Sequence, residues 1–171
     1  SLYNSNLEKE KDIFSTTIPV FVDYRGGKKI INWIHDCVDV FVYQDKICIG
    51  TTEKGFDFSI FSCNGNKIRD IHLNEEKRKI TADEKNSILE QLKRKKGPEQ
   101  WKIYSSTNEI KFRDYYPAYQ AFCVNDDRIY VFGFLQDYKY NVRILDLNGK
   151  LLKKGFIPAM VLNNVNFKTG F

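Results

Sequence analysis

The sequence predicts a mainly β protein that contains two copies of one four-stranded antiparallel unit. The first observation is an internal repeat, because residues 38–73 and 119–157 share one order of features: apolar strand, acidic turn, apolar strand, loop, apolar strand, Asn-Gly turn and final strand. Asn64-Gly65 of the first copy returns as Asn148-Gly149, 84 residues later. The second observation is composition, since aromatic residues make up 15% of the chain and favour half-buried strands over helices.

The strands of each copy can be placed from the apolar segments and the turns between them. In the first copy they are expected at residues 38–44, 46–51, 56–62 and 67–73. In the second copy they are expected at residues 119–125, 128–135, 140–147 and 150–157. The Asn-Gly dipeptides favour type I′ turns, which require a positive φ at both central residues. Each copy has the size and strand number of one β-propeller blade, within a single predicted unit of residues 1–171.

Partial strands are expected on either side of the two copies. Residues 13–22 and 30–33 are typical of strands that flank the turn Tyr24-Arg25-Gly26-Gly27, and we expect them to close a preceding blade. Residues 161–171 begin what we expect to be one more strand.

An insert at residues 74–118 separates the two copies and contains one predicted surface helix, residues 82–96. Thr81 and Glu84 form a capping box at its start, in which each side chain accepts a hydrogen bond from the other residue's backbone N–H. Gly97-Pro98 is expected to end the helix. Its narrow apolar stripe consists of Ile88, Leu89 and Leu92.

Two stretches resemble the blade pattern of bacterial six-bladed propellers of the TolB-like and NHL-like type: residues 115–131 and residues 144–151. The helix start at residues 80–85 is similar to the inter-blade helix of many uncharacterised members. The resemblance covers residues 36–157. It implies an extracytoplasmic protein, periplasmic or surface-attached, with a binding or scaffold role more often than a catalytic one. Two blades cannot close a six-bladed ring, so it also implies a fragment, a ring completed by self-association of several copies, or an open sheet.

The predicted binding site lies at one end of the two meanders. Alternate turns of a meander lie at the same end, so the longer loops at residues 52–55 and 136–140 are expected to share an end with residues 113–117. Irregular loops on a rigid scaffold tend to carry function. The mixture of aromatic and charged residues there suits a protein, peptide or glycan ligand. The predicted site residues are Arg113, Asp114, Tyr115, Tyr116, Asp137, Tyr138 and Lys139. The alternative for Tyr115-Tyr116-Pro117 is packing at the blade junction.

No catalytic, cofactor or metal-binding pattern is found in the sequence. The four cysteines form no Cys-x-x-Cys pair and have no histidine at zinc-ligand spacing, so a structural metal site is disfavoured. Their apolar neighbours favour buried free thiols, and one disulfide is the alternative if the protein is exported. His35-Asp36 is expected to be a turn dipeptide rather than a catalytic pair. A hydrolase or lyase with a metal ion in the central channel is an alternative. It is disfavoured because Asp39 is the one acidic residue that the predicted inner strands offer.

The net charge of +5 raises a third class, a basic nucleic-acid-associated protein. Residues 67–96 contain ten Lys/Arg and six Asp/Glu, and much of this excess is the run Lys93–Lys96, which suits the negative end of a helix dipole. Aromatic residues are not interleaved with these basic residues along the sequence, so nucleic-acid binding is disfavoured. No apolar run reaches the ~18 residues of a membrane span. The leading prediction is a non-catalytic binding or scaffold module.

Overall fold

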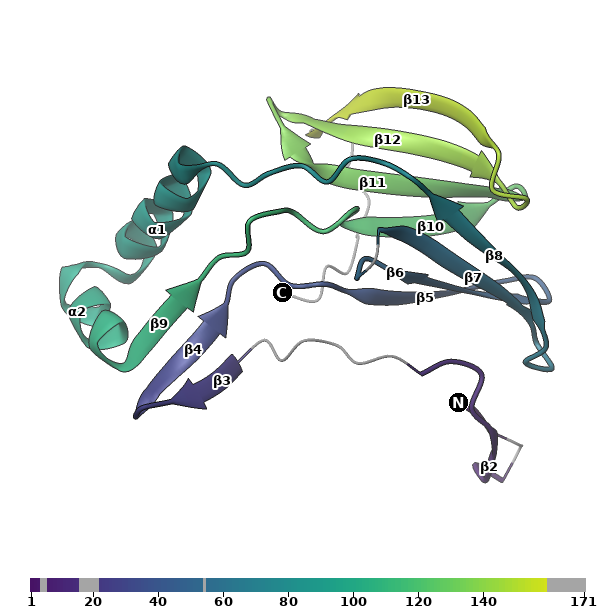
Figure 1. The fold of residues 1–171 in the computed structure, drawn as a ribbon, viewed down its shortest axis with the longest axis horizontal. Coiled ribbons are helices and arrows are strands. Elements are labelled where there is room, and N and C mark those ends of the chain that lie inside the picture. Colours follow the sequence, from purple (N-terminus) through teal and green to yellow (C-terminus); the bar gives the residue numbers. More distant parts are fainter. Residues whose placement is uncertain (4–5, 16–21, 54, 160–171) are drawn as a thin grey trace. The chain divides into compact units, whose positions relative to one another are not determined.

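The computed structural model describes residues 1–3, 6–15, 22–53 and 55–159 of the chain (Figure 1). The chain divides into two compact units. Unit 1 comprises residues 1–17, 37–76 and 118–171, and unit 2 comprises residues 18–36 and 77–117. The sequence predicted one unit with an insert at residues 74–118; in the structure residues 77–117 of that insert group with residues 18–36.

Unit 1 contains two four-stranded antiparallel sheets with the same strand order (Figure 1). The first sheet consists, in order, of β5 (Val38–Tyr43), β6 (Lys46–Thr51), β7 (Phe56–Ser62) and β8 (Lys67–Leu73). The second sheet consists of β10 (Ala121–Asn125), β11 (Arg128–Gln136), β12 (Lys139–Asp146) and β13 (Leu151–Pro158). The predicted repeat of two meanders is confirmed, with each strand end within two residues of its predicted position.

The strands of the first sheet form where apolar residues follow one another without strict alternation. Ile47, Cys48, Ile49 and Gly50 of β6 are all buried, although neighbouring side chains point to opposite faces of a sheet. A strand with this pattern is covered on both faces.

The two Asn-Gly turns are three-residue loops rather than two-residue loops. The N–H of Gly65 donates to the carbonyl of Ser62, and the N–H of Gly149 donates to the carbonyl of Asp146 in the same way. Both glycines have positive φ, 72° at Gly65 and 86° at Gly149, as predicted. The type I′ assignment is wrong, because the preceding asparagines are not among the residues with positive φ. A loop of this length closes with one left-handed glycine after an ordinary turn.

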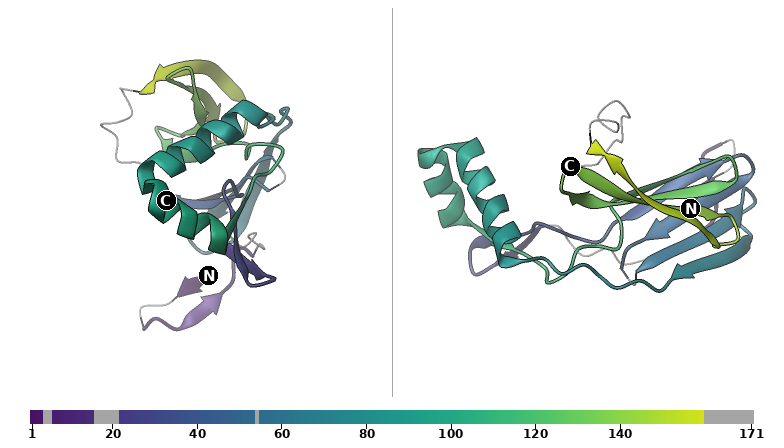
Figure 2. Two further views of the ribbon diagram at one scale, coloured as in Figure 1. Left: turned by 90° about the vertical axis from the view of Figure 1, so that its left-hand side faces the viewer. Right: turned by 90° about the horizontal axis from the view of Figure 1, so that it is seen from above.

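The two sheets pack face to face through one apolar cluster, and Figure 2 shows them from two further directions. The buried residues of this cluster are Cys48, Phe56, Phe58, Ile60 and Ile71 of the first sheet and Tyr119, Phe122, Val124, Ile129, Val131 and Leu145 in and beside the second. Phe58 stacks on Tyr119 at 5.4 Å between ring centroids and meets Phe122 edge-on at 5.2 Å. A Cβ on Gly50 would lie 2.4 Å from the Tyr119 hydroxyl, so only glycine fits below this ring.

The N-terminal residues cover part of the opposite face of the first sheet. β1 (Leu2–Tyr3) pairs with β2 (Lys9–Lys11). Leu2, Ile13 and Phe14 pack against a second apolar cluster. The buried members of that cluster are Ile47, Ile49 and Phe61. Most of the strand predicted at residues 13–22 and all of that predicted at residues 161–171 lie outside the described residues.

Unit 2 contains a three-stranded sheet in the order β3 (Val22–Arg25), β4 (Lys28–Asn32) and β9 (Asn108–Lys111). Gly26 and Gly27 form the hairpin turn that the sequence predicts there. The predicted place of residues 30–33 in a preceding blade is wrong, because β4 pairs in parallel with β9 of the insert. Such a pair needs a long crossover connection, which a meander does not contain.

The insert holds two helices where the sequence predicted one. α1 (Ala82–Lys96) has the predicted bounds and the predicted capping box between Thr81 and Glu84. α2 (Pro98–Thr107) follows after a single residue. Gly97, with φ 76°, ends α1 and turns the chain, and proline fits the first position of the next helix, where no N–H donor is needed.

The position of Gly149 leads to a prediction about the contact between the sheets. A Cβ at this position would lie 2.7 Å from Ile71 of the first sheet, in a backbone conformation that valine rarely adopts. We expect Gly149→Val to lower the free energy of unfolding by about 1–3 kcal/mol, measured by chemical denaturation. Gly155→Ala on β13 is the control, because a Cβ there meets no atom within 4 Å. Equal midpoints for both variants and the wild type would contradict the assigned loop.

Candidate functional site

The seven predicted site residues are divided between the two units. Residues 113–116 belong to unit 2, whereas Asp137 and Tyr138 connect β11 to β12 in unit 1 and Lys139 begins β12. We therefore describe them as two separate clusters.

In unit 2, Tyr116 packs against the start of α1. The Arg78 guanidinium lies over the Tyr116 ring, 3.9 Å from its centroid, and forms an ion pair with Glu84 at 2.7 Å. The backbone N–H of Tyr116 donates to the carbonyl of Arg78. Burial, followed by the nearby charge of Glu84, raises the pKa of Tyr116. The contacts of this side chain are those of a packing residue.

The neighbours of Tyr116 differ in how their side chains are engaged. Arg113 forms an ion pair with Asp36, whose carboxylate is buried. Asp36 of the His35-Asp36 dipeptide is therefore engaged in a structural contact. Asp114 lies 3.8 Å from the Lys85 ammonium. Tyr115 forms an isolated bridge with Lys79 and exposes its side chain.

In unit 1, Tyr138 stands at the tip of a tight turn. Gln136 pairs with Lys139, so only Asp137 and Tyr138 connect the strands, and their φ angles are 49° and 59°. The loop predicted at residues 136–140 is therefore a two-residue turn. Its geometry is that of a type I′ turn, in which asparagine and glycine are the usual residues. The Tyr138 side chain is 85% exposed.

A further polar cluster in unit 1 was not predicted as a site. The backbone N–H of Cys37 donates to the Thr52 hydroxyl at 2.9 Å, and the Cys37 thiol donates to the Asp39 carboxylate at 3.7 Å. The Tyr119 hydroxyl is buried and has no hydrogen-bond partner among the described residues. Burial, with the nearby charges of Asp39 and Asp57, places its pKa well above the ordinary value. In the sequence, the feature that could have indicated this polar cluster is Asp39, an acidic residue on a predicted inner strand.

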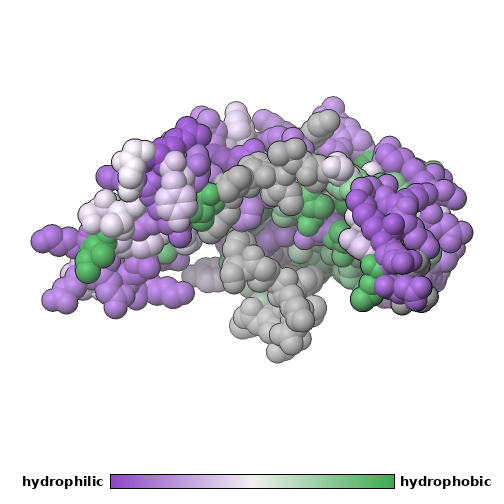
Figure 3. Space-filling model, turned by 90° about the horizontal axis from the view of Figure 1, so that it is seen from below, coloured by the Kyte–Doolittle hydropathy of each residue, from purple (hydrophilic) through white to green (hydrophobic). Residues whose placement is uncertain are grey.

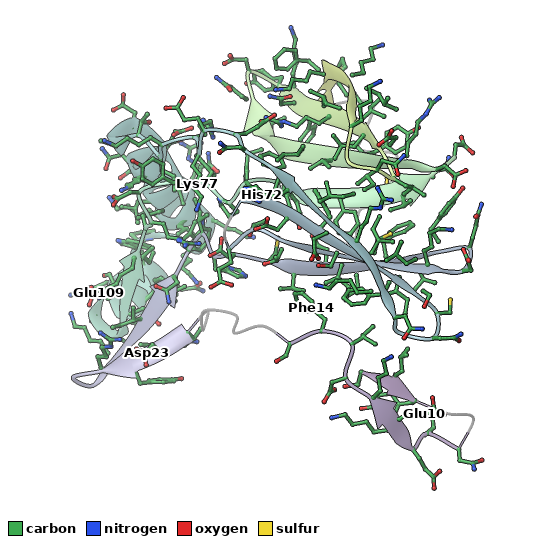
Figure 4. All side chains as sticks on the ribbon, turned by 45° about the vertical axis from the view of Figure 1, so that its right-hand side comes forward. Glu10, Phe14, Asp23, His72, Lys77 and Glu109 are labelled. Atoms are coloured by element: carbon green, nitrogen blue, oxygen red, sulfur yellow. The ribbon has the colours of Figure 1, made fainter. Side chains whose placement is uncertain are left out.

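The side chains of Asp57 and His72 form a cross-strand hydrogen bond between β7 and β8, and His72 is labelled in Figure 4. An aspartate that orients an imidazole is half of a catalytic arrangement, which also requires a nucleophile. Ser59, two residues from Asp57 on the same face, donates its hydroxyl to Asp70 on β8. Its hydroxyl is thus directed to a different carboxylate, and the pair acts as a cross-strand contact.

Glu75 forms ion pairs with the last two strands of the second sheet. Arg143 of β12 and Lys154 of β13 contact its two carboxylate oxygens, the latter at 2.8 Å. Burial alone would raise the pKa of Glu75, but the hydrogen bonds and charges of these two cations lower it. The Arg143 guanidinium also lies over the Phe56 ring at 4.6 Å. Glu75 therefore joins the end of the first sheet to the second.

Among the described residues, no group of three or more His, Cys, Asp or Glu side chains is arranged to hold a metal ion. In the same part of the chain, no helix has both the length and the apolar character of a membrane span. The comparisons with known proteins found no matching family model, no matching curated protein and no matching solved structure.

The half-buried carboxyl of Asp39 leads to a prediction about pH. Burial raises its folded-state pKa above the ordinary 3.8, although the hydrogen bond from Cys37 opposes this. Because the folded protein binds this proton more tightly than the unfolded chain does, the free energy of unfolding decreases as pH rises from 3.8 through the raised folded-state pKa. We expect Asp39→Asn to unfold at higher urea than the wild type at pH 7, and the difference to shrink as pH falls below 3.8. A less stable variant at pH 7 would show that the carboxylate is needed.

Proposed function

We propose that the chain is a non-catalytic binding or scaffold module of the β-propeller type, which contacts its ligand through Tyr138. The resemblance to TolB-like and NHL-like propellers, with their extracytoplasmic location, belongs to this proposal. The single observation that supports it best is that an almost fully exposed tyrosine occupies a left-handed position in a tight turn.

The left-handed conformation of Tyr138 costs free energy. A bulky side chain at positive φ is rare, because its Cβ approaches the neighbouring carbonyl oxygen. Two other hairpin turns among the described residues have two left-handed residues, and they use residues that tolerate this conformation: glycine at Gly26-Gly27 and aspartate at Asp126-Asp127. Tyr138 buries almost none of its side chain, so packing within the described fold does not offset the cost. Strain of this kind is common at binding sites.

The chemistry of the turn fits a protein, peptide or glycan ligand. Tyrosine offers a large flat surface and a hydroxyl, and it loses little conformational entropy on binding. Asp137 and Lys139 flank it with one charge of each sign. Tyr115 and its neighbours in unit 2 remain a separate candidate contact.

The test compares stability with binding in the same variants. Tyr138→Gly is expected to raise the free energy of unfolding by about 1 kcal/mol, because glycine relieves the strained φ. The same variant should lose retention of those members of a glycan array and a random-peptide library that bind the wild type. The matched control is Asp127→Gly, which relaxes the left-handed turn at Asp126-Asp127 and should leave binding unchanged. Undiminished binding by Tyr138→Gly, or no binding by the wild type to either panel, would contradict the proposal.

A second candidate, nucleic-acid binding, is favoured by the distribution of charge. Unit 2 contains 14 Lys/Arg and 8 Asp/Glu, whereas unit 1 contains 13 and 14. The structure also brings aromatic rings to the basic end of α1, with the Lys96 ammonium 4.1 Å from the Tyr104 ring centroid and Lys93 6.0 Å from that of Trp101. Figure 3 shows that hydrophilic side chains predominate on the face seen from below.

Salt dependence decides this second candidate. If unit 2 binds nucleic acid, the protein should be retained on immobilised single-stranded DNA at low salt, and replacing Lys93–Lys96 by glutamine should abolish retention. If the basic run only complements the helix dipole and stays solvated, the wild type and the variant should elute together in the flow-through.

A further inference from the structure

The internal repeat holds at the level of single pairs of residues. When the acidic turn Gln44-Asp45 is placed on Asp126-Asp127, Val40 corresponds to Phe122 and Val42 to Val124. The hydrogen-bonding register agrees, because Val40 pairs with Ile49 in the first sheet and Phe122 pairs with Val131 in the second. Three further apolar pairs are equivalent on this face, Ile47 and Ile129, Ile49 and Val131, and Phe61 and Leu145, and one polar pair, Ser59 and Arg143.

By this correspondence, one face of the first sheet is equivalent to the face that the second sheet buries in the core. The second sheet uses the equivalent face to pack on the first sheet, and there Phe122 is 6% and Val124 is 3% exposed. On the first sheet Val40 is 61% and Val42 is 64% exposed. The first sheet therefore presents, on its inner strand, an apolar surface of the kind that the second sheet buries.

The N-terminal residues already cover the outer part of that face. Leu2, Ile13 and Phe14, the last labelled in Figure 4, pack on the cluster of Ile47, Ile49 and Phe61. The repeat extends to this contact: a Cβ on Gly149 would meet Ile71 of the first sheet, and a Cβ on Gly65 would meet Ile13. Ile13 thus lies against the Asn-Gly turn of the first sheet in the way that Ile71 lies against the Asn-Gly turn of the second. The part of this face that stays exposed lies on β5 and includes Val40 and Val42.

The outward face of the second sheet supplies the complementary surface. By the same alignment, Phe41, Cys48 and Ile60, which face the second sheet in the core, correspond to residues on the side of the second sheet turned away from the first. These equivalents are Cys123, Tyr130 and Ile144, which pair with one another in the same register and are half-buried.

We propose that these two faces meet between copies of the chain, so that the Val40–Val42 surface of one copy packs on the Cys123–Tyr130–Ile144 surface of the next. The contact repeats between copies the packing that already joins the two sheets within one copy. It is heterologous, because the two surfaces differ, and repeated contacts of this type close into a ring when the rotation allows. With two sheets per copy, rings of four to eight blades correspond to roughly two to four copies.

The first experiment measures the mass of the wild type and of one variant by sedimentation equilibrium. The wild type should form a closed oligomer whose mass stays constant over a range of concentrations. Val40→Lys/Val42→Lys should sediment as a monomer with an unchanged circular dichroism spectrum, because both side chains are more than half exposed in a single copy. Ile103→Lys on α2, an exposed apolar position in unit 2, is the control and should keep the wild-type mass. A monomeric wild type, or an oligomer that survives the double substitution, would overturn the proposal.

The second experiment tests that the contact is head to tail. Tyr130→Lys alters the opposite surface and should also be monomeric; Cys123→Lys replaces it if Tyr130→Lys does not fold. When the folded Tyr130→Lys and Val40→Lys/Val42→Lys variants are mixed, one intact surface of each kind remains, so a one-to-one dimer that grows no further is expected. Two folded variants that stay monomeric after mixing would overturn the proposal. The oligomer does not depend on the proposed ligand contact, since Tyr138→Gly should keep the wild-type mass even where it loses binding.

Discussion

Unit 1 depends on the fit of an aromatic ring over a glycine. Tyr119 enters the core just before β10, stacks on Phe58 and meets Phe122, and its hydroxyl lies where a side chain at Gly50 would be. This contact sets the distance between the sheets, because any larger residue at Gly50 would push the ring away. The ion pairs of Glu75 with Arg143 and Lys154 and the approach of Gly149 to Ile71 join the same two sheets.

The sequence predicted the features that arise from neighbouring residues. Hairpins pair segments that are close in the chain, so the strands of unit 1, the hairpin at Gly26-Gly27 and the capping box of α1 could all be placed. The parallel pairing of β4 with β9 could not, because neither segment carries a signal for a partner so far along the chain. The second helix was missed because Gly97-Pro98 ends one helix and also suits the start of another.

The candidate site was predictable only in part, for a similar reason. The turn at Tyr138 was located, but its tight form was not, since a tyrosine gives no indication of a positive φ. The contacts that engage Tyr116 and Arg113 join residues far apart in sequence, Arg78 with the first and Asp36 with the second. Such long-range contacts decide which of the predicted site residues are packed within the fold and which are exposed. Tyr138 is exposed, and it is therefore the best-supported ligand contact.

The parallel pair of β4 and β9 has a consequence for the order of folding. Lys29 lies opposite Asn108, so the whole first sheet is contained in the loop that this pair closes. Closing a long loop costs conformational entropy, and a loop already made compact by a folded sheet costs less. The hairpins of the first sheet should therefore form early and bring the two strands within reach, with the sheet of unit 2 completed later. During synthesis, the β3–β4 hairpin would lack its third strand, β9, until the first sheet and both helices had emerged.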